Sequence, residues 1–467
     1  MNLLLDEITK AINGTLEGHG DRIARGYSID TRTLNPGDLF FAVKGPRFDG
    51  HQFVRQAFEK KAAGAVVDEG FSGSDVSSPE FSVIRVPSAV AALQSLSQYV
   101  RRKWAKSILG VTGSAGKTTT KAMIAQVLER KFNVLRTIGS LNNELGVPLT
   151  LLRLQDGHDI GVLEMGMSAK GEIRHLAEIA EPNEGLITNV NPVHLEFFNS
   201  IEDIAAAKAE LIEGLFEPRT AFLNSDDARV RAMSTKCTGH VVTYGVNEAA
   251  DFKAEQIRER GLDGSTFTVR HRNESVDFSM PLLGTHNVTN ALAAIAVGAS
   301  HNVTWPEIQT AVEAMKPEKM RGQVIRLRDG IAVIDDSYNS NPRALTEMIR
   351  FIGRVQGFSR KIVVAGEMLE LGRESAGLHR ACGEEAVRAG VNLVVGVQGM
   401  AKEILNGARI AGLPESCLMF LPDSSQAGEY LVRAIKPGDV VLLKGSRGVK
   451  LEKVLEALQV QTGNRES

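Results

Sequence analysis

The chain has 467 residues, 43% of them hydrophobic and 24% charged, with a formal net charge of −2. This length predicts roughly three domains, and the near-zero charge gives no reason to expect nucleic acid or an anionic membrane as a partner. The three cysteines form no CxxC pair, which argues against a zinc site or a disulfide framework. No apolar run reaches the roughly 20 residues of a membrane helix, so we expect a cytoplasmic protein.

Residues 1–85 are predicted to form a small α/β domain. A helical pattern covers residues 4–12, and apolar strands are predicted at residues 39–43 and 63–67. The Ser-, Gly- and Pro-rich residues 71–79 are predicted to form a loop.

Residues 86–316 are predicted to form a larger α/β domain. A helix at residues 89–104 leads into a strand at 107–111, and strands at 160–163, 185–188 and 221–223 then alternate with helices. This alternation predicts a parallel, doubly wound sheet. A polar, strand-rich stretch at 241–280 and a helix at 288–299 complete the domain.

Residues 317–467 are predicted to form a second, Rossmann-like doubly wound domain. Helical patterns separate its four clearest strands, which are predicted at residues 331–334, 361–365, 393–396 and 440–443.

A phosphate-binding loop is predicted between the strand at 107–111 and a helix at 121–130. Small residues let backbone N–H groups approach a phosphate, and the helix N-terminus adds positive potential. Lys117 is expected to reach the β- and γ-phosphates of a nucleotide, and the Thr118 hydroxyl is expected to bind Mg²⁺. The general pattern has glycine where this chain has Val111, so the alternative is a tight turn that happens to contain Gly-Lys-Thr. The predicted nucleotide-binding residues are Thr112, Gly113, Ser114, Ala115, Gly116, Lys117, Thr118 and Thr119.

Polar residues follow the neighbouring strands, at the edge where open α/β sheets bind ligands. Glu164 directly follows the strand at 160–163. A buried carboxylate at this position suits Mg²⁺, which prefers oxygen ligands. The alternative is that Glu164 caps the next helix. His194 is expected to be a metal ligand beside Glu164, although a histidine alone is more often structural. Lys208, in a helical stretch at 204–210, is by itself expected to be solvated.

Polar clusters also follow three strands of the third domain, at residues 335–342, 366–368 and 444–448. The pair Asp335 and Asp336 suits ribose hydroxyls or a cation, and Lys444 and Arg447 suit a carboxylate or phosphate. Because the three clusters share one predicted sheet edge, they indicate a second ligand site.

These motifs, in this order and over essentially the whole chain, resemble those of the Mur ligases. The resemblance rests on the phosphate loop, the Glu164 cluster and the runs at 189–194, 284–291 and 335–342. Five stretches resemble in particular the Mur ligases that add D-alanyl-D-alanine to a UDP-N-acetylmuramoyl-tripeptide, namely residues 142–148, 164–166, 335–342, 366–372 and 444–447. Residues 28–32 and 36–40 are similar to the UDP-sugar domain of the family.

The resemblance implies three domains with separate tasks. Residues 1–85 would bind the UDP-sugar, residues 86–316 would bind ATP and Mg²⁺, and residues 317–467 would form the C-terminal ligase domain. A monomer is expected, without nucleic acid or membrane partners.

The resemblance also implies roles for single residues. Glu164 and His194 would bind Mg²⁺, and Lys208 matches a lysine that several Mur ligases carry as a carbamate, a metal-binding anion. Asn290 would meet the adenine of ATP, Arg321 a phosphate and Asp336 the ribose; Tyr338 stands where some relatives have a basic residue. Substrate-binding roles are expected for Ser28, Asp30, Thr31, Arg32, Asn142, Asn143, Ser168, Asn339, Asn341, Lys444 and Arg447.

The expected reaction proceeds through an acyl phosphate. ATP would phosphorylate the terminal carboxylate of the tripeptide, and the amine of D-alanyl-D-alanine would displace phosphate to give the pentapeptide. Charge neutralisation by Mg²⁺, Lys117 and Arg321 would dominate the first barrier, and no enzyme nucleophile is needed. Two alternatives stay open. One is another ligase of the superfamily, such as MurE or a folylpolyglutamate synthase, and the other is a non-catalytic ATP-dependent switch.

Overall fold

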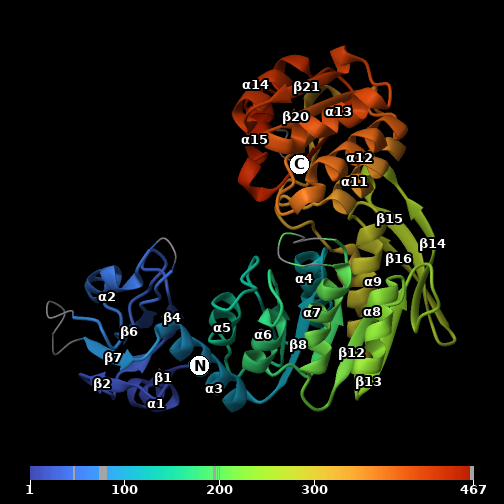
Figure 1. The fold of residues 1–467 in the computed structure, drawn as a ribbon. Helices are drawn as coiled ribbons and strands as arrows, with labels where there is room; N and C mark the ends of the chain where they lie inside the picture. The colour runs from blue at the N-terminus through green and yellow to red at the C-terminus, as the bar shows by residue number, and fades with distance from the viewer. Residues whose placement is uncertain (46–47, 73–80, 193–195, 197, 199, 463–467) are drawn as a thin grey trace. The chain divides into compact units, whose positions relative to one another are not determined.

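The computed structural model describes residues 1–467 except 46–47, 73–80, 193–195, 197, 199 and 463–467. The chain divides into two compact units. The first unit contains residues Met1–Thr188, Ala205–Thr243 and Ala296–Val303, and the second contains Asn189–Ile204, Tyr244–Ile295 and Thr304–Ser467. Helices and strands alternate through both units (Figure 1), which confirms the predicted α/β class. Among the described residues, no helix is both long and apolar enough to cross a membrane.

The N-terminal part of the first unit is built on a five-stranded sheet with the order β2-β7-β6-β5-β4. Strands β4 to β7 pair in parallel, and β2 pairs antiparallel with β7. Side chains of β5 and β6 are almost completely buried, because both faces of these apolar strands are covered. The elements are β1 (Leu3–Leu4), α1 (Leu5–Ala11), β2 (Thr15–Glu17), β3 (Ile23–Ala24), β4 (Gly26–Ser28), β5 (Asp38–Phe41), α2 (Val54–Glu59), β6 (Gly64–Asp68) and β7 (Ser82–Val86).

Helix α3 (Ala89–Trp104) covers the range that the sequence predicts. The hydroxyl of Ser88 accepts a hydrogen bond from the Ala91 N–H and so caps its N-terminus. Its apolar side chains recur every three or four residues and form one buried stripe. The helix ends at Ala105, which adopts a left-handed conformation.

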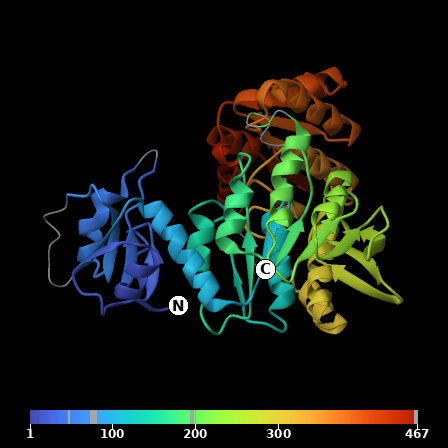
Figure 2. The same cartoon turned by 60° about the horizontal axis from the view of Figure 1, so that its bottom comes forward.

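The second sheet of the first unit carries the predicted phosphate loop. It is part of a nine-stranded sheet with the order β16-β15-β14-β13-β12-β11-β8-β10-β9, in which β8 pairs in parallel with both β10 and β11. Figures 1 and 2 show these cyan and green strands as a sheet separate from the blue N-terminal one. The strands are β8 (Ser107–Thr112), β9 (Val134–Arg136), β10 (Ile160–Glu164), β11 (Glu184–Ile187), β12 (Thr220–Asn224) and β13 (His240–Gly245). The helices are α4 (Lys117–Leu128), α5 (Gly146–Leu151), α6 (Glu172–Ala180), α7 (Ile201–Glu213) and α8 (Ala228–Ala232).

One predicted boundary in this sheet is wrong. The helix after the phosphate loop begins at Lys117, four residues before the predicted start at Lys121. Gly116 precedes it with a φ of 82°, a left-handed turn that glycine adopts without strain, so the chain enters the helix at once. Residues 117–120 are therefore helical, although three of them are threonines with low helix propensity.

The second unit begins its sheet structure with β14 (Phe252–Glu259), β15 (Ser265–His271) and β16 (Glu274–Met280), which pair antiparallel. Helix α10 (Trp305–Glu313) packs beside β16, where the Trp305 indole N–H donates to Glu274 at 2.9 Å. Helix α9 (Thr285–Ser300) follows β16 in the chain, and its last residues belong to the first unit.

The C-terminal part of the second unit is a doubly wound sheet with the order β17-β18-β22-β19-β20-β21. All pairs from β18 to β21 are parallel, and β17 is antiparallel to β18. The strands are β17 (Gln323–Arg326), β18 (Ala332–Asp335), β19 (Arg360–Gly366), β20 (Leu393–Val397), β21 (Leu418–Leu421) and β22 (Asp439–Lys444). The helices are α11 (Pro342–Arg354), α12 (Ser375–Arg388), α13 (Lys402–Ile410), α14 (Ser424–Ala434) and α15 (Glu452–Thr462).

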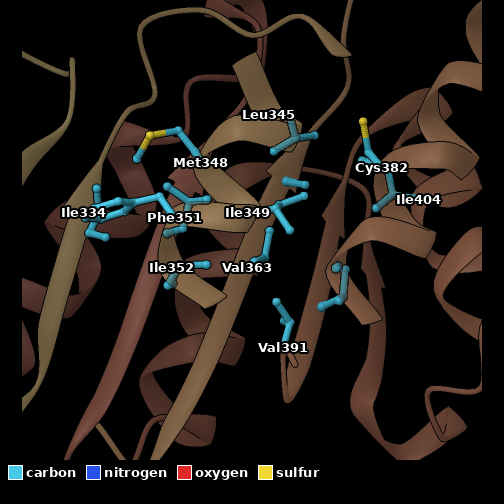
Figure 3. Close-up of a cluster of buried hydrophobic side chains, with 14 of the residues drawn as sticks. Ile334, Leu345, Met348, Ile349, Phe351, Ile352, Val363, Cys382, Val391 and Ile404 are labelled. Atoms are coloured by element: carbon cyan, nitrogen blue, oxygen red, sulfur yellow. The ribbon is translucent and has the colours of Figure 1, made fainter. Parts of the chain in front are cut away.

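Two hydrophobic clusters cover the two faces of this sheet. Helices α11, α12 and α13 bury one face, and α14 and α15 bury the other. Figure 3 shows the first cluster, in which Ile349 and Phe351 of α11 lie near Ile334 and Val363 of the sheet. Leu262, from the turn between β14 and β15, belongs to the same cluster. With both faces covered, the polar residues at the strand ends are the ones left to meet a ligand.

Candidate active site

The phosphate loop lies between β8 and α4. Lys117, the first residue of the helix, donates from Nζ to the Gly113 carbonyl oxygen at 2.7 Å. The Thr188 hydroxyl, just beyond the neighbouring strand β11, donates to the Ala115 carbonyl oxygen at 2.7 Å. The loop is thus held from its own helix and from the next strand, with the helix N-terminus behind it, which is the arrangement that binds a phosphate.

Glu164, the last residue of β10, lies beside this loop. It pairs in register with Val111 of β8, and only 1% of its surface is exposed. Its Oε1 accepts hydrogen bonds from the Thr118 hydroxyl at 3.1 Å and the Asn142 amide at 2.8 Å. Its Oε2 is buried and accepts no hydrogen bond from the residues that the structure describes. The Lys121 ammonium lies 3.9 Å from this oxygen. Because the oxygen accepts no hydrogen bond there, it can also serve as a ligand of Mg²⁺, which prefers oxygen ligands.

Lys208, in α7, is the second unusual charged group of the first unit. Only 2% of it is exposed. Burial, and secondly the charge of Lys117, hold the pKa of Lys208 well below its usual value. The amine is therefore neutral more readily than a solvated lysine, contrary to the expectation from composition alone.

The predicted metal site is only partly visible. His194 lies outside the described residues. Within the part of the chain that the structure describes, no group of three or more His, Cys, Asp or Glu residues is arranged to hold a metal ion. Thr118 and Glu164 do meet, through the hydrogen bond between their side chains.

The remaining residues predicted in the first unit have structural partners. Asn143 Oδ1 accepts from the Gly146 N–H at 2.9 Å and so helps to start α5. The Ser168 hydroxyl lies 3.3 Å from the carboxylate of Glu172. At the end of β4, the Ser28 hydroxyl accepts from the Asp30 N–H at 3.1 Å. The cluster that follows it is held by the bonds Asp30–Arg32 and Thr31–Gln56.

In the second unit, the residues predicted to meet ATP lie in three places. Asn290 is buried in α9 and donates to Asn287 Oδ1 at 3.1 Å. The Arg321 guanidinium lies over the ring of Tyr338, 4.1 Å from its centroid. Asp336 follows β18 and accepts from Lys444 Nζ at 2.5 Å, so the predicted ribose ligand and the predicted anion ligand neutralise each other here.

The other residues predicted at this strand edge also have partners within the protein. The Asn339 carbonyl oxygen accepts from Lys444 Nζ at 3.2 Å, and Arg447 pairs with Glu452 at 2.7 Å. Asn341 is the N-cap of α11, because its Oδ1 accepts from the Ala344 N–H at 2.9 Å. A ligand at this edge would exchange some of these bonds for its own.

Two residues that the sequence reasoning missed belong to the Glu164 cluster. Lys121 lies 3.9 Å from Glu164 Oε2, and the Thr137 hydroxyl accepts from the Glu164 N–H at 3.0 Å. The spacing of four between Lys117 and Lys121, which places both on one side of a helix, was the available signal for the first. No local signal marks Thr137, since only the pairing of β9 with β10 brings it there.

Comparisons with known proteins agree over the whole chain. Three family models match: Mur ligase family, catalytic domain, at residues 24–105; Mur ligase middle domain at 111–298; and Mur ligase, glutamate ligase domain, at 320–447. The UDP-N-acetylmuramoyl-tripeptide–D-alanyl-D-alanine ligase of Bacillus subtilis (strain 168) is 34% identical, covering 97% of each chain. The ligase of the same name from Escherichia coli (strain K12) is also 34% identical, covering 98% of this chain and 99% of its own.

Solved structures give the same result. A crystal structure of MurF from Acinetobacter baumannii is similar with a TM-score of 0.88 and 27% identity, covering 98% of this chain and 99% of its own. MurF ligase from Thermotoga maritima in complex with ADP is similar with a TM-score of 0.82 and 28% identity, covering 94% of this chain and 98% of its own.

Proposed function

The chain belongs to the Mur ligase family, and we propose that it is the ATP-dependent ligase that joins D-alanyl-D-alanine to UDP-N-acetylmuramoyl-tripeptide in peptidoglycan synthesis. The partners are thus the UDP-linked tripeptide, D-alanyl-D-alanine and ATP. The single structural observation that carries the proposal is the Glu164 carboxylate beside a phosphate loop, whose buried Oε2 accepts no hydrogen bond from the described residues. A non-catalytic switch needs a nucleotide-binding loop, but it does not need the second polar strand edge that ends β18 and β22.

The reaction has two steps. The terminal carboxylate of the tripeptide attacks the γ-phosphorus of ATP, and ADP leaves, which gives an acyl phosphate. The amine of D-alanyl-D-alanine then attacks the acyl carbon, loses a proton, and expels phosphate. Both reactants of the first step are anions, so cations and N–H dipoles at the phosphates lower its barrier most. Lys117, at the N-terminus of α4, is placed to do this once a nucleotide replaces its bond to Gly113.

Mg²⁺ is a part of this proposal that the chain's own residues support. Glu164 and Thr118 would hold it, together with His194 and a carbamylated Lys208. When bound, the ion supplies positive charge to the transferring phosphate. The Asn142 amide bonds only Oε1 of Glu164 and so leaves Oε2 available.

Carbamylation of Lys208 follows from the same environment. A neutral amine nitrogen attacks the carbon of CO₂ and releases a proton, which turns the side chain into an anion. The low pKa that burial imposes keeps the amine neutral and reactive. The nearby charge of Lys117 would then stabilise the carbamate that forms.

The other assignments are proposals that rest on the family. We propose three domains at residues 1–85, 86–316 and 317–467, a monomeric enzyme, and a cytoplasmic reaction, because the cytoplasm supplies ATP. Asn290, Arg321 and Asp336 would contact the nucleotide, and Arg321 would also assist the phosphate transfer. Substrate would meet Ser28, Asp30, Thr31, Arg32, Asn142, Asn143, Ser168, Asn339, Asn341, Lys444 and Arg447.

A coupled assay of ADP release tests the proposal. Purified protein receives Mg²⁺, ATP and the UDP-tripeptide, with either D-alanyl-D-alanine or single amino acids as the amine. We expect ADP release that depends on the tripeptide and the dipeptide together, and a product heavier by one dipeptide less water. ADP release with a single amino acid alone would replace this function with that of another ligase of the superfamily. Nucleotide binding without stimulated release would favour a switch.

A further inference from the structure

Lys121 is a buried lysine that the reaction described above does not use. It lies one turn after Lys117 in α4, and only 2% of it is exposed. Its Nζ donates to the backbone carbonyl oxygens of Thr137 and Gly139, each at 2.9 Å. It also lies 3.9 Å from Glu164 Oε2, the oxygen without a hydrogen bond. Burying an ammonium group is costly unless it is paired and hydrogen-bonded, and Lys121 meets both conditions.

These contacts form a closed network around Glu164. Thr137 receives the Lys121 hydrogen bond on its carbonyl oxygen and the Glu164 N–H on its hydroxyl. Glu164 Oε1 accepts from Thr118 of α4 and from Asn142. The network therefore joins three segments that are distant in sequence: the start of α4, the end of β10 and the residues after β9.

The residues after β9 form a loop at 137–145 that depends on such anchors. Ile138 and Leu141 are 57% and 44% exposed, so apolar packing holds this loop only weakly. Gly139, one of the two Lys121 acceptors, has a left-handed φ of 54°. The loop carries Asn142 and Asn143, which lie next to Glu164 and at the start of α5. Its position therefore decides where the Asn142 amide stands relative to the phosphate loop.

We propose that Lys121 is a positioning residue for ligation, which fixes the Glu164 carboxylate and the 137–145 loop against the phosphate-loop helix. Its positive charge holds Glu164 Oε2 without occupying it by a hydrogen bond, so the oxygen stays available for a cation. Its two carbonyl bonds hold the loop at its base. This role rests on the proposed function, because only ligation gives the loop a substrate to meet.

The test compares Lys121→Met and Thr137→Val with the control Lys106→Met in the full-length protein. Lys106 also donates to two backbone carbonyls, those of Asp156 and His158, but it lies at the opposite end of β8 from the phosphate loop. Thr137→Val removes only the hydroxyl that accepts a hydrogen bond from the Glu164 N–H. The network can therefore still be tested with this variant if Lys121→Met fails to fold. The readouts are steady-state ligation kinetics, ATP binding without Mg²⁺, thermal unfolding, and amide hydrogen exchange.

We expect kcat/KM for the UDP-tripeptide to fall about 100-fold in Lys121→Met, the cost of a misplaced active site. Amide exchange across 137–145 and at Glu164 should rise, while ATP affinity without Mg²⁺ changes less than about threefold, because Lys117 remains. Thr137→Val should show the same pattern with a smaller loss, and Lys106→Met should match the wild type.

The opposite pattern overturns the proposal. A lowered melting temperature in Lys121→Met with unchanged kcat/KM and unchanged exchange of the loop would make Lys121 merely structural. Thr137→Val with wild-type kinetics and wild-type exchange at Glu164 would contradict the network. If the wild-type protein had no ligase activity, the proposed function would be wrong. The hydrogen-exchange experiment would still show whether Lys121 holds the 137–145 loop and Glu164 in place.

Discussion

Replacing Lys117 with methionine is expected to abolish most ligase activity while leaving the fold nearly intact. In the structure, the Lys117 ammonium donates a hydrogen bond of 2.7 Å to the Gly113 carbonyl oxygen, and the residue is only half-buried. Such a bond contributes about 0.5–1.5 kcal/mol to the free energy of unfolding. Methionine keeps the apolar stem and has high helix propensity, so the loss of stability should stay within this range.

The catalytic loss should be much larger. Removing one preorganised donor from a developing anion costs about 100- to 1,000-fold in kcat, or about 2.7–4 kcal/mol of transition-state stabilisation. The loss of the Lys117 charge should also raise the pKa of Lys208, because that charge is the second cause of its low value. Less of the Lys208 amine would then be neutral, which disfavours the proposed carbamate and adds to the loss.

The assay combines ADP release with chemical unfolding and with binding of the UDP-tripeptide. Binding should stay near the wild-type value, because the predicted UDP-sugar residues lie in the separate N-terminal sheet. Lys131→Met is the matched control, since Lys131 follows the other end of α4 and also donates to backbone carbonyls, those of His301 and Asn302. Ligase activity of Lys117→Met within about tenfold of the wild type would refute the phosphate role of Lys117.

Three further predictions concern the second unit. His379 is neutral in the folded protein, because its Nε2 accepts a hydrogen bond from the Met368 N–H at 3.0 Å and because burial lowers its pKa. The unfolded histidine has a pKa of about 6.5. The stability that neutral His379 contributes is therefore fully present above about pH 6.5, and it is lost as the pH falls from there through the lower pKa of the folded state. Melting temperatures from pH 7.5 to 5 should fall less steeply in His379→Gln than in the wild type, and equal slopes would contradict this. Tyr338→Leu should raise the Kd for ATP about two- to fivefold, because it removes the ring under Arg321, whereas Tyr338→Phe should leave the Kd unchanged. Calorimetry measures both values, and an equal loss of ATP affinity in the two variants would exclude a role for the ring contact. Ile349→Ala should lower the free energy of unfolding by about 2–5 kcal/mol in denaturant titrations, because Ile349 is fully buried; a change below 1 kcal/mol would mean that the cluster repacks.

The sequence by itself determined the α/β class, the main strands and the phosphate loop. These features depend on patterns within about 15 residues, namely apolar runs, helical periodicity and a glycine-rich turn. Such patterns determine the local backbone conformation without reference to distant segments. Helix α3 was predicted to the residue, since Ser88 caps its start and its apolar positions recur at helical spacing. Glu164 was located for the same reason, because it stands at the end of an apolar strand.

Only the tertiary structure decided how the charged groups of the site are paired. Lys121 looks like a solvated lysine in the sequence, yet the parallel pairing of β9 with β10 brings the Thr137 and Gly139 carbonyls to it. Lys444 and Asp336 are 108 residues apart and meet because β22 inserts next to β18. Burial and charge pairing depend on which strands become neighbours in the sheet. Which strands become neighbours depends in turn on contacts between segments that are far apart in the sequence. A local sequence pattern can therefore identify a charged residue as a candidate site residue. It cannot predict the partner that determines the protonation state and the role of that residue.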